Sequence, residues 1–212
     1  MRSISHWFLS ALFACSVFLL LPRAAQAIGT NSCQPDEATA CTGNTGDIGD
    51  DSCWSADSCK NNVGNVGDDS CHGTSACVSN SGTIADLSCN GVTACYFNEG
   101  NIARGACVGG ADCASNSGNI HKKACLGDYA CNSNTGHISK KACVGFAACF
   151  ENTGNVGVNS CQGDFACDGN SGKIAKKACQ GDRACFGNMQ DRKKGECNGP
   201  PVNGVGVCEQ PI

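Results

Sequence analysis

The stretch KKACLGDYACNSNTGHISKKACVGFAACFENTG, residues 122–154, contains one short motif twice. Lys122-Lys123-Ala124-Cys125 returns eighteen residues later as Lys140-Lys141-Ala142-Cys143. The same interval extends well beyond this stretch, because a cysteine falls at every eighteenth position from Cys53 to Cys197. A second cysteine follows six residues after each of these, up to Cys185. Most of the chain is therefore a tandem repeat.

The repeat unit reads C-x-G-x-x-A-C-x-x-N-x-G-x-[IV]-x-x-x-[AS], and its positions are numbered here from 1 to 18. A unit this short cannot hold two packed helices, and its recurrent Gly and Asn disfavour any helix. We therefore predict an all-β fold, a disulfide-laddered parallel β-solenoid of about nine 18-residue coils. The Asn at position 10 should bond through its amide to the copies above and below and to corner backbone groups. Ile or Val at position 14 and Ala or Ser at position 18 should form a thin interior.

The two ends of the chain depart from the repeat. Residues 1–27 have the features of a signal peptide: Arg2, an apolar run from Trp7 to Leu21, and a small-x-small site at Ala25-Gln26-Ala27. Residues 28–52 read as an N-terminal cap with a first partial repeat, 53–196 as the repeats, and 197–212 as a C-terminal cap. No second apolar stretch follows the signal, so we expect a secreted protein, extracellular or at the cell surface, without a membrane span.

The cysteines number 21, and removal of the signal with Cys15 leaves 20, which can pair completely. Such a density is typical of oxidised extracellular scaffolds. Three pairings are conceivable: neighbours within a coil, one coil to the next, or stacked equivalents. We favour the first, because it uses every cysteine and treats all units alike, whereas the second strands Cys33 and Cys208 at opposite ends. It gives Cys33–Cys41, Cys53–Cys59, Cys71–Cys77, Cys89–Cys95, Cys107–Cys113, Cys125–Cys131, Cys143–Cys149, Cys161–Cys167, Cys179–Cys185 and Cys197–Cys208.

Zinc is the rival interpretation of paired cysteines. The five-residue gap inside each pair falls outside the usual ligand spacing, histidines are few, and the compartment is oxidising. The Gly-Gly-x-Gly-x-Asp motif of calcium-binding repeats is also missing. We expect no metal and no cofactor.

The repeat resembles the short-repeat, cysteine-laddered β-solenoids, of which insect ice-binding proteins are the best-known kind. The resemblance implies that ice binding, as in the insect proteins, would depend on a flat Thr-x-Thr array. The threonines of this chain are scattered, as at Thr45, Thr83, Thr135 and Thr153. The scaffold matches and the ice-binding motif does not, so ice binding is kept as an alternative only.

Catalytic residues are hard to find. His72, His121 and His137 each occupy a different unit position, and no Ser/His/Asp set recurs. The aspartates at position 4 are candidates for catalysis, because on adjacent coils they would stack and could act as an acid/base pair. They are Asp128, Asp164 and Asp182. A turn-favouring Asp after Gly explains them more simply. We expect a protein that is not an enzyme, with a polysaccharide-active enzyme as the alternative.

Three aromatic residues fall at positions 4 and 5 of consecutive coils: Tyr129, Phe146 and Phe165. An exposed strip of rings could stack on sugars, whereas loop aromatics often only cover cystines.

Charge is segregated along the chain. Residues 28–102 carry 10 acidic and 1 basic side chain, whereas residues 103–212 carry 9 acidic and 12 basic ones. Positions 16 and 17 follow this division: Asp50-Asp51, Asp68-Asp69, Asp86-Leu87, Arg104-Gly105, Lys122-Lys123, Lys140-Lys141, Val158-Asn159 and Lys176-Lys177, with Lys193-Lys194 one place out of register. We call Lys122, Lys123, Lys140, Lys141, Lys176, Lys177, Lys193 and Lys194 the lysine ridge.

The lysine ridge has three interpretations: a passive solvated face, a binding surface for a polyanion, or one half of an end-to-end self-association. The sequence as a whole predicts a secreted, non-enzymatic, disulfide-rich repeat protein. It would act as an extracellular scaffold or binding rod for an anionic polysaccharide, another polyanionic surface polymer, or a host or partner protein.

Overall fold

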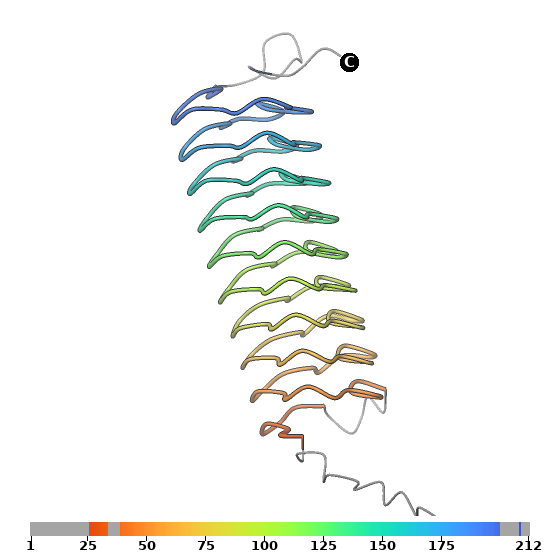
Figure 1. The fold of residues 1–212 in the computed structure, drawn as a ribbon. Coiled ribbons are helices and arrows are strands. Elements are labelled where there is room, and N and C mark those ends of the chain that lie inside the picture. Colours follow the sequence, from red (N-terminus) through yellow and green to blue (C-terminus); the bar gives the residue numbers. More distant parts are fainter. Residues whose placement is uncertain (1–25, 34–38, 200–207, 209–212) are drawn as a thin grey trace, which may run out of the picture.

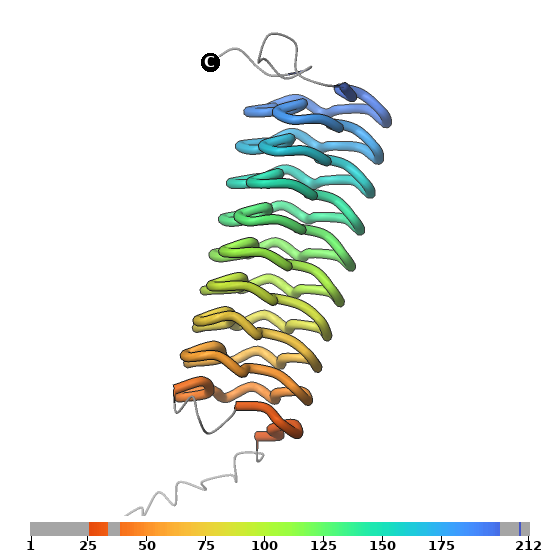
Figure 2. Tube along the Cα trace, turned by 180° about the vertical axis from the view of Figure 1, so that it is seen from behind, coloured from red at the N-terminus to blue at the C-terminus, as the bar shows by residue number. Residues whose placement is uncertain are grey.

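The computed structural model describes residues 26–33, 39–199 and 208, which form an elongated stack of coils (Figure 1). One repeat makes one coil, and successive coils follow one another from the first repeat to the last (Figure 2). Only Gln26 and Ala27 of the expected signal peptide are described, and most of the expected C-terminal cap also lies outside the described residues.

The prediction of an all-β parallel β-solenoid is wrong. The described residues contain no helix and no strand, and their β-structure is limited to isolated parallel bridges that build no sheet. One series of bridges joins position 14 of successive coils, as in Ile120↔Ile138, and continues to Arg192. A second series joins position 2 from Val108 to Asn198. The chain is an irregular, disulfide-rich repeat.

The backbone conformation explains why no strand forms. Four positions of the unit, 1, 5, 9 and 17, lie in the left-handed region of φ, as shown by Cys125 (54°), Tyr129 (59°), Ser133 (57°) and Lys141 (57°), and the glycine at position 3 of the later coils also has a positive φ. A residue in this left-handed region cannot continue an extended strand. The coil is therefore a series of turns, and the extended arcs that we expected between the corners are too short to pair as strands.

Backbone hydrogen bonds still connect the coils without strands. In the coil that begins at Cys125, the Cys131 amide donates to the Asp112 carbonyl of the preceding coil (2.7 Å). The Cys125 amide donates in the opposite direction, to the Ala142 carbonyl of the next coil (3.0 Å). Turned backbone can thus satisfy its polar groups between coils as a sheet would.

The Asn column at position 10 behaves as predicted. The Nδ2 of Asn98 donates to Oδ1 of Asn80 (2.7 Å) and to the Gly100 carbonyl of its own coil (2.7 Å). The same amide-to-amide bond recurs from Asn62 to Asn188 at 2.7–2.8 Å. These side chains are fully buried, so the column is a continuous hydrogen-bonded line through the interior.

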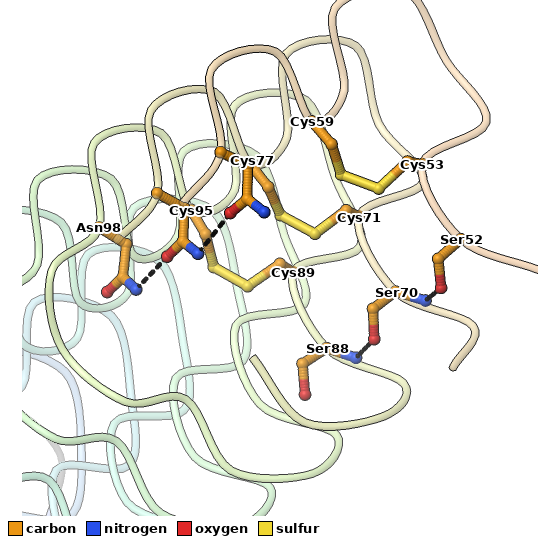
Figure 3. The surroundings of a disulfide bond; sticks show 12 residues. Ser52, Cys53, Cys59, Ser70, Cys71, Cys77, Ser88, Cys89, Cys95 and Asn98 are labelled. Carbon is orange, nitrogen blue, oxygen red and sulfur yellow. Dashed lines mark hydrogen bonds between the residues drawn. A yellow bond between two sulfur atoms is a disulfide. The ribbon is translucent and has the colours of Figure 1, made fainter. Parts of the chain in front are cut away.

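The interior is thin and uniform. Position 14 is buried throughout, from Ile48 to Ile174, as are the residues at position 18. Where position 18 is serine, its hydroxyl accepts the amide of the next copy, as Ser52 does from Ser70 at 3.1 Å (Figure 3). Glycine is required at position 12 because a Cβ on Gly118 would collide with the Gly136 carbonyl.

The disulfides form one column along the stack, and Figure 3 shows three of them in successive coils. The structure joins the neighbouring cysteines of the first pairing scheme, from Cys33–Cys41 to Cys197–Cys208, with Cα–Cα distances of 5.4–5.8 Å. Because the core holds few large side chains, these cross-links carry much of the constraint that a hydrophobic core would supply.

Candidate polyanion-binding ridge

Backbone bonds align the lysine pairs of adjacent coils. The Lys141 amide donates to the Lys122 carbonyl (3.3 Å), so position 17 of one coil lies against position 16 of the coil before it. The Asn159 amide donates to the Lys140 carbonyl (3.2 Å), and the Lys177 amide to the Val158 carbonyl (3.0 Å). The lysine pairs therefore form one line, with Val158-Asn159 as its gap.

The last lysines continue this line in part. The Gly195 amide donates to the Lys176 carbonyl (3.3 Å), which puts Gly195 at position 17 and Lys194 at position 16. Lys193 then falls at position 15, beside the line. All eight lysines of the ridge are exposed.

The ridge ammonium groups have no anionic partner in the described part of the chain. The ion pair found there joins Lys60 and Asp57 at 3.5 Å, in an early coil. Every lysine of the ridge is thus free to meet an external anion.

The acidic counterparts of these lysines have a structural task. The Oδ1 of Asp68 accepts the Asp50 amide (2.8 Å), and the Oδ1 of Asp86 accepts the Asp68 amide (3.3 Å). Each carboxylate at position 16 thus clamps its coil to the preceding one. An ammonium group cannot accept such a bond. Sequence reasoning missed this role, although the recurrence of aspartate at position 16 of the early coils was a usable signal.

The aspartates at position 4 act in the same way. The Oδ1 of Asp182 accepts the Asp164 amide (2.9 Å), and the Oδ1 of Asp164 accepts the Phe146 amide (2.9 Å). Asp128 accepts the Gly110 amide (2.7 Å). These side chains are exposed and each has one oxygen committed to a clamp, which gives them a role without catalysis.

A shallow groove runs beside the ridge. It has a volume of about 370 Å³ and is lined by Lys123, Leu126, Lys141, Val144, Asn159, Gln162 and Gln180. The Nε2 of Gln162 donates to the Lys141 carbonyl (2.7 Å), and the Nε2 of Gln180 to the Asn159 carbonyl (3.0 Å). Side-chain amides thus fix this surface next to two of the ridge lysines.

The three predicted aromatic residues do meet. The rings of Tyr129 and Phe146 are 5.9 Å apart and those of Phe146 and Phe165 are 5.3 Å apart, edge to face in both cases. With Phe150 and Asp168 among their neighbours they line an apolar groove of about 300 Å³. Burial, followed by the nearby Glu151, raises the pKa of Asp168 to about 6, although Arg183 opposes the shift.

The histidines divide into two groups. His72 stacks on Trp54, with centroids 5.5 Å apart, and its Nε2 lies 2.6 Å from the Asp51 carbonyl. His121 and His137, which occupy different unit positions, are brought together on adjacent coils with centroids 4.6 Å apart. His121 is at position 15 and His137 at position 13, so a comparison of the repeats position by position did not predict this contact.

One buried acid stands out. Asp112 occupies position 6, where the neighbouring coils carry alanine, and it is fully buried. Neither carboxyl oxygen makes a hydrogen bond of good geometry within the described residues, although the backbone amides of Cys131 and Gly127 lie near enough to favour the charged form. Burial raises its pKa well above the usual range. Asp112 approaches Cys113 and Cys125, but both sulfurs are in disulfides, so the group lacks the thiolates that a metal would need.

Cystines, repeated coils and an exposed basic line define a cysteine-rich repeat protein with a disulfide ladder. The chain belongs to the family described as a domain of unknown function, DUF7640, which it matches over residues 13–112 and again over residues 106–209. No curated protein and no solved structure matches the chain. Within the described residues, no helix is long and apolar enough to cross a membrane.

Proposed function

We propose that this protein is an exported, non-enzymatic rod that binds a linear polyanion along the lysine ridge. The observation that carries the proposal is the alignment of exposed lysine pairs on stacked coils without an anionic partner. The coils are joined by backbone hydrogen bonds, and neighbouring chains bonded in this way in a sheet lie about 4.8 Å apart. Ammonium groups at that spacing suit a polymer with regularly spaced anionic groups, whose binding releases counterions.

The cost of the ridge supports a function beyond solubility. Like charges held side by side repel one another, and each lysine at position 16 replaces a residue type that clamps the early coils together. A passive solvated face would be served as well by aspartate or by mixed charges. A bound polyanion would remove the repulsion.

An acidic polysaccharide is the polymer that we favour over a nucleic acid. The coils that carry the ridge also carry the apolar groove of Tyr129, Phe146 and Phe165, in which the exposed rings of Tyr129 and Phe146 offer faces on which a sugar can stack. Export is supported by the ten disulfides, which persist in oxidising compartments. The structural task of the position-4 aspartates supports a protein that does no chemistry.

The test is binding of residues 28–212 to heparin, alginate and duplex DNA over a range of salt concentrations. Affinity should fall steeply with salt, and Lys140→Ser with Lys141→Ser should weaken it and reduce the salt slope by roughly one to two. The matched control is Lys60→Ser, compared with Lys141→Ser alone: it removes one cation from an early coil, away from the ridge, and should have a smaller effect.

Three results would change the conclusion. Binding of DNA but of neither polysaccharide would identify a nucleic-acid rod. Oligomers at low salt without added polymer, seen by sedimentation, would favour end-to-end association. A monomer that ignores all three polymers would leave the lysines as a passive face.

A further inference from the structure

His121 and His137 face the same side of the stack from adjacent coils. The His121 amide donates to the Ile138 carbonyl (2.9 Å), which holds position 15 of one coil beside position 14 of the next. Ile120 and Ile138 point into the interior, so the histidines that follow and precede them point outward. Both imidazoles are exposed, with centroids 4.6 Å apart and planes at 73°.

The ring nitrogens of this pair have no hydrogen-bond partner in the described residues, in contrast to His72, whose Nε2 lies 2.6 Å from the Asp51 carbonyl. The backbone around the pair is held in place, since the His137 amide donates to Oδ1 of Asn155 (3.1 Å). Open space adjoins both rings: a hollow of about 470 Å³ is lined by His121 and His137, and a second of about 330 Å³ by His137 and Ser139.

The separation of the rings matches that of two imidazoles on one metal ion. With a metal–nitrogen bond of about 2.0–2.1 Å, the ring centroid lies about 3.2 Å from the metal. Two rings at adjacent coordination positions then have centroids about 4.5–5.2 Å apart, for angles of about 90–109° at the metal. The observed 4.6 Å lies within that range.

We propose that His121 and His137 form a two-imidazole site for a divalent transition-metal ion, with Cu²⁺ held more tightly than Zn²⁺. Imidazole suits both ions, and copper binds more tightly to a given nitrogen site in the divalent series. Water completes the coordination, because no carboxylate or thiolate lines either hollow. The site does not depend on polyanion binding.

The charges around the pair agree with this assignment. Imidazole binds a metal in its neutral form, so binding should strengthen as pH rises. Lys122, Lys123 and Lys140 are close in sequence, and Lys173 and Lys176 line the second hollow. These cations disfavour protonated imidazole and bound metal alike, so the site should be of modest affinity.

The experiment is titration of the oxidised residues 28–212 with Cu²⁺ alone, followed by calorimetry and by electron paramagnetic resonance for nitrogen ligation. His121→Ala and His137→Ala should each weaken binding about a hundredfold, because two tethered ligands act at high effective concentration. His72→Ala, the matched control, should leave it unchanged. Since all three side chains are on the surface, circular dichroism and non-reduced mass should stay the same.

The proposal is overturned if the His121→Ala/His137→Ala double variant binds Cu²⁺ as the parent does, which would place the ion at the amino terminus or elsewhere. It is equally overturned if His72→Ala causes the same loss. A parent protein that gives no nitrogen-ligated copper signal at micromolar concentrations would also exclude the site.

Discussion

The Nδ2 of Asn134 donates a hydrogen bond to Oδ1 of Asn116 at 2.8 Å, and the same nitrogen donates to the Gly136 carbonyl at 2.7 Å. One buried amide thus joins two coils and closes a turn of its own coil. Position 10 is asparagine in every coil from Asn44 to Asn188, as constant as the cysteines at positions 1 and 7.

Asn134→Ala should therefore destabilise the stack. It leaves the Gly136 carbonyl and Oδ1 of Asn116 short of a donor in the interior, and such a loss costs about 1–3 kcal/mol. Chemical denaturation followed by circular dichroism would measure it. Ser117→Ala is the control, because Ser117 is exposed. An Asn134 variant as stable as this control would mean that the amide column does not hold the coils together.

Asp112→Ala should stabilise the protein at neutral pH. The carboxyl is buried without a hydrogen bond of good geometry in the described part of the chain, and burial raises its pKa despite the nearby amides of Cys131 and Gly127, so the folded state favours the protonated form. The stability that Asp112 contributes to the folded state is therefore fully present below the usual pKa of about 3.9, where the carboxyl is protonated in both states. It is lost as pH rises through the folded-state pKa. Alanine cannot ionise, so the variant keeps its stability as pH rises. Alanine is also the residue at position 6 of the neighbouring coils, as in Ala94 and Ala130.

The expected gain is about 1–3 kcal/mol near pH 8 and shrinks towards pH 4. Denaturation midpoints at both pH values would measure it. Asp128→Ala provides the comparison, because it removes a clamp on the Gly110 amide and should destabilise at both pH values. A less stable Asp112→Ala protein at pH 8 would show that the carboxylate has a favourable interaction that the geometry does not reveal.

Mass spectrometry of a non-reduced digest should find no free thiol and should find Cys125 joined to Cys131. Cys125→Ser with Cys131→Ser should lower stability by about 2–3 kcal/mol, the chain-entropy value for so short a loop. Reduction of all bridges should unfold the chain, since little apolar area remains to hold it. A peptide that links Cys131 to Cys143 would contradict the intracoil ladder.

Filling the gap in the lysine ridge should strengthen polyanion binding. Val158→Lys with Asn159→Lys would connect the pairs on either side, because the Asn159 amide bonds to Lys140 and the Val158 carbonyl to Lys177. Affinity for heparin should rise and its salt dependence should steepen. Thr135→Lys with Thr153→Lys adds the same charge at exposed position 11 and serves as the control. Equal gains in both variants would indicate a general charge effect and no ridge.

The sequence by itself determined the register of this protein. An eighteen-residue period with Asn at position 10 and Ile or Val at position 14 requires each copy to stack on its equivalent, and the amide column and the buried Ile column follow that rule. The reason is that each residue of a coil contacts the equivalent residue of the next coil, so a contact made by one pair of coils recurs in every pair. The Asp112 exception was also readable, as an acid in an alanine column.

Only the tertiary structure decided the backbone path and the contacts between unlike positions. The left-handed residues at position 5 include Asp57, Thr93 and Phe165, which share no composition that would predict positive φ. Their conformation is imposed by the disulfide ring and by the coil on either side, so strands were expected where turns occur. The meeting of His121 with His137 likewise depends on the offset between coils, which places position 15 beside position 13 of the next.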